Sequence, residues 1–499
     1  MTDATEQLAR CDRVRYRAAL PCSLILVVLA ALLWPPAADA QPFSAAERQK
    51  VDALVAGVLA KSDTPSASVV VVRGDRIAFS KAYGEAALQP RRAATTDTRY
   101  EIGSIAKQFT ATLVLMLVDE GRLSLDDKVG RYLPNASGAD QVTIRQLLSQ
   151  TAGYPNYWVV SYLRPAMRRD VRPQQIVDTW GRQPLMFQPG AQWNYSNTNY
   201  VLAGRIVETV EGRPLAETLE SRLFRPLAMA SAHADFSPPV GRGDAEGYTR
   251  VALGPRRSAD RPPPGWEFAA GGLSMTPEDL AQWDLAMLGH RLLSPAAYLA
   301  QQTSVRLADG SDAHYGLGLY VQEKAGHRIL RHDGSTPGFL TENRVYPDDH
   351  DAIIVAVNAD FGSAPSDIAD GLQTILLGDL GGHVASATAS PAAPPPKPVD
   401  PATTALAERV LRDFALGRID RNLFTANDLG YLTPEVRADL RRTLTRLGPP
   451  ASVELVRREP WSGYDGSIHE VSWPHRKLVL VMLRTGDGRL DDFDLFSPD

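Results

Sequence analysis

A tract rich in proline and alanine divides the chain. Residues 385–402 read ASATASPAAPPPKPVDPA, and a segment of this composition buries no core and acts as an extended, semi-rigid spacer. It separates a body, residues 41–384, from a tail, residues 403–499. Two folding units are therefore expected. The 499 residues are 44% hydrophobic and 22% charged, which is typical of globular domains and excludes disordered and collagen-like chains.

Residues 1–40 have the pattern of a secretory signal peptide. An apolar run from Leu20 to Trp34 is followed by Ala38-Asp39-Ala40, a small-x-small cleavage pattern before Gln41. The basic residues before the run include Arg13, Arg15 and Arg17. The run has about 15 residues, fewer than the roughly 20 that span a bilayer. We expect a cleaved signal peptide and a periplasmic or secreted protein. The alternative, and the one expected route to a membrane, is an uncleaved segment that anchors the chain in the inner membrane.

The cysteines and the charge exclude several classes of function. Both cysteines, Cys11 and Cys22, lie in the leader, so the mature chain is expected to lack disulfides, thiol catalysis and cysteine-bound metals. The net charge is -5 and the basic residues form no patch, which argues against nucleic acid as a partner. The histidines show no metal-binding spacing, and no cofactor is implied. The expected partner is a small-molecule or peptide substrate.

The hydrophobic periodicity of the body predicts an α/β fold of the α+β kind, with an antiparallel sheet flanked by helices and an all-helical insert. A β-hairpin is expected around the Gly74-Asp75 turn. The expected helices are 45–59, 104–120, 144–149, 199–211 and 277–288. The expected strands are 66–73, 76–83, 316–322, 328–332, 339–346 and 352–358. The shape of the pocket depends on the 156–182 insert and the 241–266 loop, whose positions do not follow from the sequence.

The tail is expected to form a small α+β unit of unknown role. Its patterns predict helices at 403–416 and 434–447, then strands at 452–459, 467–473, 477–484 and 489–496, with Gly486-Asp487-Gly488 turning the last pair. No catalytic grouping is evident in it. We expect it to fold independently and to be dispensable for chemistry, with a lid over the active site as the second interpretation.

The first candidate for chemistry is Ser104-Ile105-Ala106-Lys107 at the start of the expected buried helix. A hydroxyl and an amine three residues apart share one helix face and can exchange a proton. The N–H groups of the helix start can also stabilise a developing oxyanion. An ordinary helix start is the alternative, because the bare pattern is common. A chemical role is favoured because a lysine on an apolar helix is costly unless its pKa is lowered or its charge is paired.

The second candidate is Tyr195-Ser196-Asn197, on a loop that leads into a helix. A phenol near an ammonium can be held ionised and accept the serine proton. The amide of Asn197 can hold both the lysine and a substrate carbonyl. The alternative interpretation is a helix cap, with Tyr195 packed in the core.

The third candidate is His332-Asp333-Gly334-Ser335, at the end of an expected strand. Gly334 lets a substrate backbone approach closely, and the Ser335 N–H can complete an oxyanion hole. A lone histidine at a strand end is otherwise a polar partner of its neighbours.

Taken together, these segments resemble the serine β-lactamase and penicillin-recognising family, most closely its class C, D-aminopeptidase and esterase branch. That branch uses S-x-x-K, Y-x-N, then K-T-G or H-x-G, in this order. The surrounding segments are similar too, over roughly residues 44–375. They are Leu147–Gly153, Phe187–Gly190, Ala270–Leu273 and Tyr315–Gly318.

The resemblance implies a role for each residue. Ser104 is the nucleophile and Lys107 helps to deprotonate it. Tyr195 is the general base that later protonates the leaving group, and Asn197 orients the substrate and Lys107. His332 and Gly334 line the site, while the N–H groups of Ser104 and Ser335 form the oxyanion hole. No metal or cofactor is implied.

One departure from the family pattern bears on the substrate. Members that bind β-lactams usually carry a small hydroxyl at the middle of the third motif, whereas this chain has Asp333, which repels a carboxylate if it faces the pocket. The leading hypothesis is therefore an exported serine hydrolase that cleaves an ester or a peptide amide. The alternatives are a β-lactamase or DD-peptidase of the same family, and a catalytically silent binding or sensor protein.

Overall fold

The computed structural model describes residues 42–160, 163–234, 241, 243–381 and 400–497. The expected leader, with its cleavage site and both cysteines, and most of the Pro/Ala spacer lie outside the described residues. Residues Gln41–Asp499 form one compact unit. Among the helices of the described residues, none is long and apolar enough to cross a membrane.

The body is built on a seven-stranded antiparallel sheet with the strand order β3-β2-β1-β11-β10-β9-β8. Strands β1 and β11 lie side by side at its centre, with Val69 opposite Val355. Both are buried along their whole length, as their continuous apolar sequences require. The strands are β1 Ser66–Val72, β2 Ile77–Leu88, β3 Arg91–Ala93, β8 Tyr320–Lys324, β9 His327–Thr336, β10 Phe339–Tyr346 and β11 Asp351–Val357. The short pairs are β4 Tyr100–Glu101 with β7 Ser274–Met275, and β5 Tyr248–Thr249 with β6 Arg257–Ser258.

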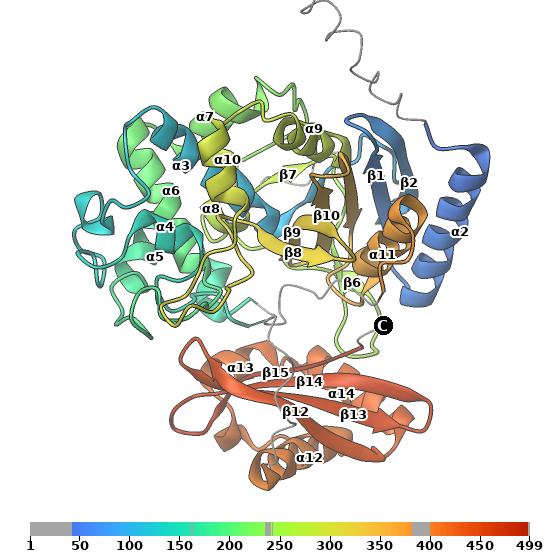
Figure 1. Ribbon diagram of the computed structural model, residues 1–499. Coiled ribbons are helices and arrows are strands. Elements are labelled where there is room, and N and C mark those ends of the chain that lie inside the picture. The colour runs from blue at the N-terminus through green and yellow to red at the C-terminus, as the bar shows by residue number, and fades with distance from the viewer. Residues whose placement is uncertain (1–41, 161–162, 235–240, 242, 382–399, 498–499) are drawn as a thin grey trace, which may run out of the picture. The chain divides into compact units, whose positions relative to one another are not determined.

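Helices cover both faces of this sheet. The first face carries α2 (Ala45–Ser62) and α11 (Ala364–Leu377), which pack together and enclose a core that includes Val55, Val355 and Ile368 (Figure 1). The second face carries the larger core, formed with α3 and the other helices of the body. These helices are α3 Ala106–Asp119, α4 Ile144–Leu148, α5 Pro173–Thr179, α6 Asn197–Glu211, α7 Leu215–Leu219, α8 Phe268–Gly271, α9 Pro277–Leu288 and α10 Pro295–Gln302. Shorter turns are Gly103–Ile105, Val129–Arg131, Pro165–Arg168 and Glu220–Phe224.

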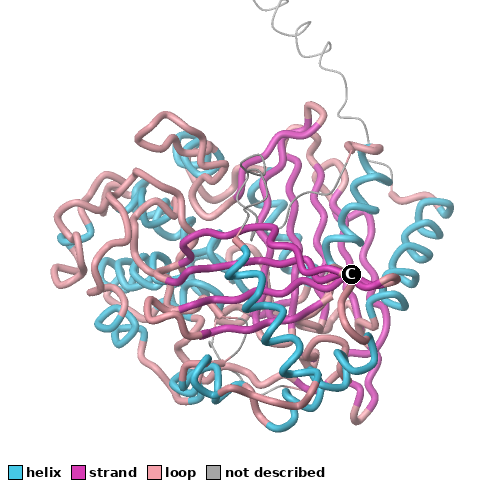
Figure 2. The backbone as a smooth tube through the Cα atoms, turned by 90° about the horizontal axis from the view of Figure 1, so that it is seen from below, coloured by secondary structure: helices cyan, strands magenta, loops and turns pink. Residues whose placement is uncertain are grey.

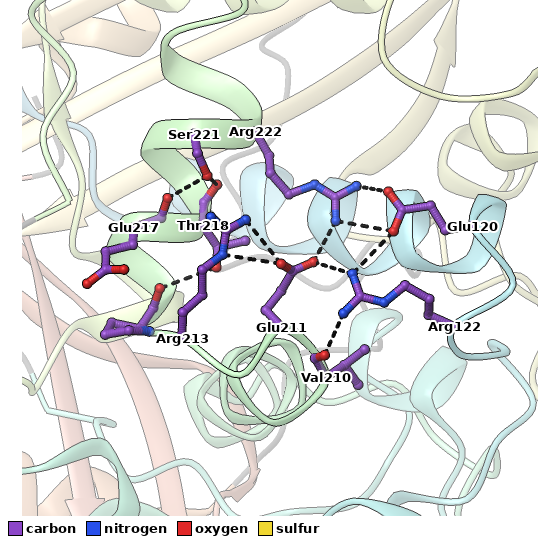
Figure 3. A network of polar contacts seen from close by, with 10 residues as sticks. Glu120, Arg122, Val210, Glu211, Arg213, Glu217, Thr218, Ser221 and Arg222 are labelled. Carbon is purple, nitrogen blue, oxygen red and sulfur yellow. Dashed lines mark hydrogen bonds and ion pairs between the residues drawn. The ribbon is translucent and has the colours of Figure 1, made fainter.

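An ionic network ties the far end of α3 to the helical region. Glu211, the last residue of α6, pairs with Arg122 at 2.8 Å, Arg213 at 3.0 Å and Arg222 at 2.6 Å (Figure 3). Arg222 also pairs with Glu120, which follows α3. Burial acts to raise the pKa of Glu211, but the arginines outweigh it and hold the pKa below its ordinary value. The helix that begins at the candidate site is therefore fixed at its other end as well.

The tail forms a second sheet with a core of its own. Four antiparallel strands in the order β12-β13-β14-β15 pack with helices around residues such as Phe414, Leu440, Leu480 and Phe493 (Figures 1 and 2). The elements are α12 Pro401–Ala415, α13 Ala426–Tyr431, α14 Pro434–Leu447, the turn Arg421–Leu423, β12 Ser452–Trp461, β13 Tyr464–Trp473, β14 Arg476–Arg484 and β15 Leu490–Phe496.

The tail also contacts the body. Arg164 pairs with the buried Asp491 at 2.8 Å, and Arg257 pairs with the buried Asp439. The backbone N–H of Leu253 donates to the Thr443 hydroxyl at 3.2 Å. The tail is thus joined to the body through Arg164 at its sheet and through Leu253 and Arg257 at α14.

The structure confirms the expected fold class. Helix α9 and strand β10 match their predicted ranges to the residue, as does α14 in the tail. Several expected strand bounds were wrong, and β2 continues to Leu88 instead of ending at residue 83. Residues 316–319 are not part of β8, and β9 does not stop at His332 but continues to Thr336. The helices α5, α7, α8, α10, α11 and α13 were not predicted.

Candidate active site

Ser104 and Lys107 lie where the chain enters α3. The expected helix start at Ser104 is two residues early, because Gly103–Ile105 forms a 3₁₀ turn and α3 begins at Ala106. Gly103 has φ +50°, a conformation that glycine adopts at little cost. Ser104 is partly exposed, whereas Lys107 is 0% exposed. The prediction of a buried lysine on this helix is confirmed.

The amine of Lys107 has three oxygen neighbours. Its Nζ lies 2.9 Å from Ser104 Oγ and 2.8 Å from Asn197 Oδ1, and donates to the Ala270 carbonyl at 2.7 Å. Burial lowers the pKa of Lys107 well below its ordinary value, while the charges of Asp333 and Glu267 raise it. Burial thus favours the neutral amine, which is the form that can accept the serine proton.

Tyr195 completes the group around Ser104. Its ring centroid lies 4.8 Å from Lys107 Nζ. Burial raises the pKa of Tyr195 well above its ordinary value, although its hydrogen bond with Ser104 acts in the opposite direction. Burial of Tyr195 therefore opposes the ionised phenol that the sequence analysis considered. The protonated phenol, which burial favours, is the form that can donate a proton to a leaving group.

Asn197 is held by residues to which the sequence analysis gave no role. Its backbone N–H donates to Asn156 Oδ1 at 3.0 Å. The preceding N–H, of Ser196, donates to Gln150 Oε1 at 3.0 Å. The Asn199 side chain donates to the same Gln150 oxygen at 2.7 Å. The signal for Gln150 lay in the 147–153 segment, which looked family-like but suggested no contact.

The third motif lies directly against the turn that carries Ser104. A Cβ on Gly334 would stand 1.9 Å from the Ile102 carbonyl oxygen, and a Cβ on Gly103 would stand 2.8 Å from the Ser335 nitrogen. The backbone of β9 therefore touches the backbone of residues 102–103. This contact places the Ser335 nitrogen against Gly103, the residue before Ser104. An oxyanion hole built from Ser104 and Ser335 requires such closeness.

His332 lies beside Tyr195 and is uncharged. It is 0% exposed, and its ring centroid is 6.2 Å from that of Tyr195. Its Nδ1 lies 2.7 Å from the Asp333 carbonyl oxygen, and its Nε2 lies 3.3 Å from the Tyr315 hydroxyl. Burial lowers the pKa of His332 to about 3, and the charge of Lys107 acts in the same direction. His332 thus adds no cation to the site.

Asp333 brings negative charge to the site. It lies 3.3 Å from Arg331, which is itself 3.5 Å from Glu342. The charge of Asp333 raises the pKa of Lys107 and also of Tyr195. Its carboxylate is thus close enough to influence both groups. The residues named from sequence, Ser104, Lys107, Tyr195, Asn197, His332, Gly334 and Ser335, all converge on this one place.

The sheet, the helical region and the serine–lysine–tyrosine group define the serine β-lactamase and transpeptidase-like class. A sequence model of the Beta-lactamase family matches residues 51–376, which is more than half of the chain. The chain therefore belongs to the Beta-lactamase family.

Curated relatives match the body of the chain. Protein flp of Staphylococcus aureus strain MRSA252 is 26% identical over 327 residues, which are 62% of this chain and 63% of that protein. D-aminopeptidase of Brucella anthropi is 28% identical over 320 residues, which are 63% of this chain and 59% of that protein. The chain thus spans about three fifths of the length of these relatives.

Solved structures share the fold. A D-stereospecific amidohydrolase from Streptomyces sp. has a TM-score of 0.57 and 29% identity, over 68% of this chain and 99% of that chain. The octameric penicillin-binding protein homologue from Pyrococcus abyssi has a TM-score of 0.59 and 20% identity, over 90% of this chain and 98% of that chain. The matched 90% of the chain is a larger fraction than residues 41–384 make up, so the structural similarity extends into the tail.

Proposed function

We propose that this chain is an exported serine hydrolase that cleaves an ester or a peptide amide through an acyl-serine intermediate. One observation carries the proposal: a fully buried lysine, with its pKa lowered by burial, lies 2.9 Å from the hydroxyl of Ser104. A neutral amine at that distance is the base that a serine nucleophile needs. Export rests on the signal-like pattern of residues 1–40.

The reaction follows from the positions of these groups. Ser104 Oγ attacks the substrate carbonyl carbon while its proton passes to Lys107, and the N–H groups of Ser104 and Ser335 stabilise the oxyanion. The carbon–nitrogen or carbon–oxygen bond then breaks, and the leaving group takes the proton of Tyr195, which Lys107 restores. Water repeats the sequence on the acyl-enzyme and releases the acid.

The charges near Ser104 favour certain substrates. Asp333 and Glu267 place negative charge near Lys107, and His332 is neutral. A substrate carboxylate beside the scissile bond is therefore disfavoured, and neutral or amine-bearing substrates are favoured. D-amino-acid peptides and cell-wall peptides fit this proposal, and two of the relatives are named D-aminopeptidase and D-stereospecific amidohydrolase.

A fluorescent fluorophosphonate probe separates an enzyme from a silent binding protein. The mature wild-type protein should label, and Ser104→Ala should not. Lys107→Arg should label at least a hundredfold more slowly, because a guanidinium keeps its proton. Ser137→Ala, which changes a serine outside the site, should label like the wild type. An unlabelled wild-type protein would favour the binding-protein alternative.

A substrate screen then separates the remaining alternatives. p-Nitrophenyl esters and D-amino-acid anilides should be cleaved with a higher kcat/KM than a chromogenic cephalosporin. The reverse order would favour the β-lactamase or DD-peptidase alternative. Fractionation of cells expressing the full chain tests export: the protein should appear in the periplasm or the medium, without residues 1–40.

A further inference from the structure

Glu267 is a buried carboxyl beside the catalytic group, and the reaction outlined above gives it no role. It is 9% exposed and immediately precedes α8. A Cβ on Gly271 would stand 3.8 Å from Glu267 Oε1 and 3.7 Å from the carbonyl carbon of Gly103. The carboxyl of Glu267 and the residue that precedes Ser104 therefore both lie against Gly271.

The carboxyl of Glu267 joins two walls of the site. Its Oε1 accepts a hydrogen bond from the Thr336 hydroxyl at the end of β9. Thr336 directly follows Ser335, whose N–H belongs to the expected oxyanion hole. On the other side, Glu267 immediately precedes the short helix α8. Within α8, the Ala270 carbonyl accepts a hydrogen bond from the Lys107 amine at 2.7 Å. A single side chain thus links the lysine pocket to the oxyanion strand.

Glu267 is also coupled electrically to Lys107. Burial raises the pKa of Glu267, while the Thr336 hydroxyl and the charges of Arg261 and Lys107 lower it. In return, the charge of Glu267 raises the pKa of Lys107. The other charged or titratable groups facing this pair are Asp333, which acts on Lys107, and Tyr157, on which Glu267 acts. Lys107 is also faced by the rings of Tyr195 and Tyr200 and by His332, on which its charge acts.

We propose that Glu267 is a positioning residue of the acylation site, which holds the Lys107 pocket and the Ser335 N–H in register and places a carboxyl group next to that pocket. This inference rests on the proposed function and deepens it. It assigns Glu267 no contact with the substrate. Its action passes through Thr336 on one side and through the Ala270 carbonyl and Lys107 on the other.

The mechanical part of the proposal is tested by a double-mutant cycle on the rate of fluorophosphonate labelling. Glu267→Ala and Thr336→Val should each slow labelling about tenfold or more, and the double variant should be no slower than the worse single variant. Thr336→Ser, which keeps the hydroxyl, should restore the rate to within threefold of wild type. Single variants within twofold of wild type, or a double variant whose loss is the product of the two, would overturn the proposal.

The electrical part is tested by a readout that needs no activity. Lysines carrying ¹³C at Cε are titrated by NMR in the full mature chain, and Lys107→Arg assigns the Lys107 signal. Glu267→Gln keeps an acceptor for Thr336 but removes the charge, so the pKa of Lys107 should fall. Glu278→Gln, in which the altered carboxyl pairs with Ser80 outside the site, should leave it unchanged. An unchanged Lys107 pKa in Glu267→Gln would overturn the assignment. This arm decides the role of Glu267 even if the wild-type protein does not label, an outcome that would count against the proposed function alone.

Discussion

Gly334 lies so close to Ile102 that no side chain fits between them: a Cβ on Gly334 would stand 1.9 Å from the Ile102 carbonyl oxygen. Strand β9, which carries the third motif, is therefore positioned by backbone contact with the turn that carries Ser104. Gly103 makes the same kind of contact with Ser335, at 2.8 Å from a virtual Cβ to the nitrogen. The close approach of Ser335 to the turn that carries Ser104 depends on these two glycines.

Gly334→Ala should therefore disable the oxyanion hole. The added methyl must push β9 away from residues 102–103, which moves the Ser335 N–H. Loss of one oxyanion donor lowers kcat by about 10² to 10³, or about 2.7 to 4 kcal/mol. We expect kcat/KM on a p-nitrophenyl ester to fall at least a hundredfold. Gly57→Ala is the control, because Gly57 lies in α2 with nothing within 4 Å of a Cβ, and it should keep wild-type activity. A Gly334→Ala enzyme within threefold of wild type would contradict this contact.

Asp333→Thr should change the preference between substrates. Removing a carboxylate that acts on Lys107 and Tyr195 should raise kcat/KM for substrates with a carboxylate next to the scissile bond, relative to neutral esters. The repulsion removed is about 1 kcal/mol in a wet site and larger in a dry one, which is about a fivefold to tenfold change in the ratio. Asp348→Thr, at an exposed pair with Arg328, should leave the ratio unchanged. An unchanged ratio in Asp333→Thr would show that its side chain does not act on the bound substrate.

The sequence predicted the elements whose ends are marked locally. Helix α9 begins at Pro277, after Thr276, whose side-chain oxygen accepts a hydrogen bond from the Asp279 N–H. A threonine followed by a proline predicts such a helix start from the sequence alone. The Ser104–Lys107 pair could also be predicted, because the apolar helix around Lys107 indicates that this lysine is buried. The rest depends on distant partners. Strand β9 continues through the glycine because β10 pairs with it, with Leu340 opposite Ser335.

Two further misses have the same origin. Residues 316–319 leave the sheet at Gly318, which has φ +85° and packs against the Lys107 carbonyl, 2.9 Å from a virtual Cβ. Glu267 and Thr336 are 69 positions apart in the sequence. Neither residue lies in a sequence motif that would predict their hydrogen bond. Contacts of this kind depend on how distant segments pack in the folded protein, so they cannot be predicted from local patterns in a single sequence.

Asp428 should make stability fall as pH rises. It is 0% exposed, both of its carboxyl oxygens lack a hydrogen-bond partner, and burial raises its pKa to about 8. The folded state therefore holds a proton that the unfolded state releases near pH 4, so this stabilising contribution is complete below about pH 4 and is lost progressively as pH rises toward 8. Asp428→Asn should flatten the decline between pH 5.5 and 8, measured by urea unfolding.

Asp487→Asn is the matched control for Asp428→Asn. Its hydrogen bond with Arg489 holds the pKa of Asp487 below its ordinary value, so Asp487 is ionised in both states above pH 5.5 and should not alter the slope. A slope equally steep in Asp428→Asn and wild type would contradict the assignment of a buried, protonated Asp428.

Truncation after Ala392 tests the role of the tail. The catalytic group described above contains no tail residue, so kcat/KM on a small ester should stay within a few-fold of the full chain. Stability should fall, because Arg164 and Arg257 lose the buried carboxylates of Asp491 and Asp439. Thermal unfolding and kinetics of the two forms decide this, and residues 400–499 expressed alone test independent folding. A loss of a hundredfold or more in kcat/KM would make the tail part of the catalytic unit.

The central claim is that Ser104 forms a covalent acyl-enzyme with help from Lys107. Its most direct test is intact-protein and peptide mass spectrometry of the mature protein, quenched in acid during turnover of a p-nitrophenyl ester. The account predicts one added acyl group, located on the peptide that contains Ser104, and none in Ser104→Ala. An acyl group on another residue, or equal acylation and turnover in Ser104→Ala, would contradict it.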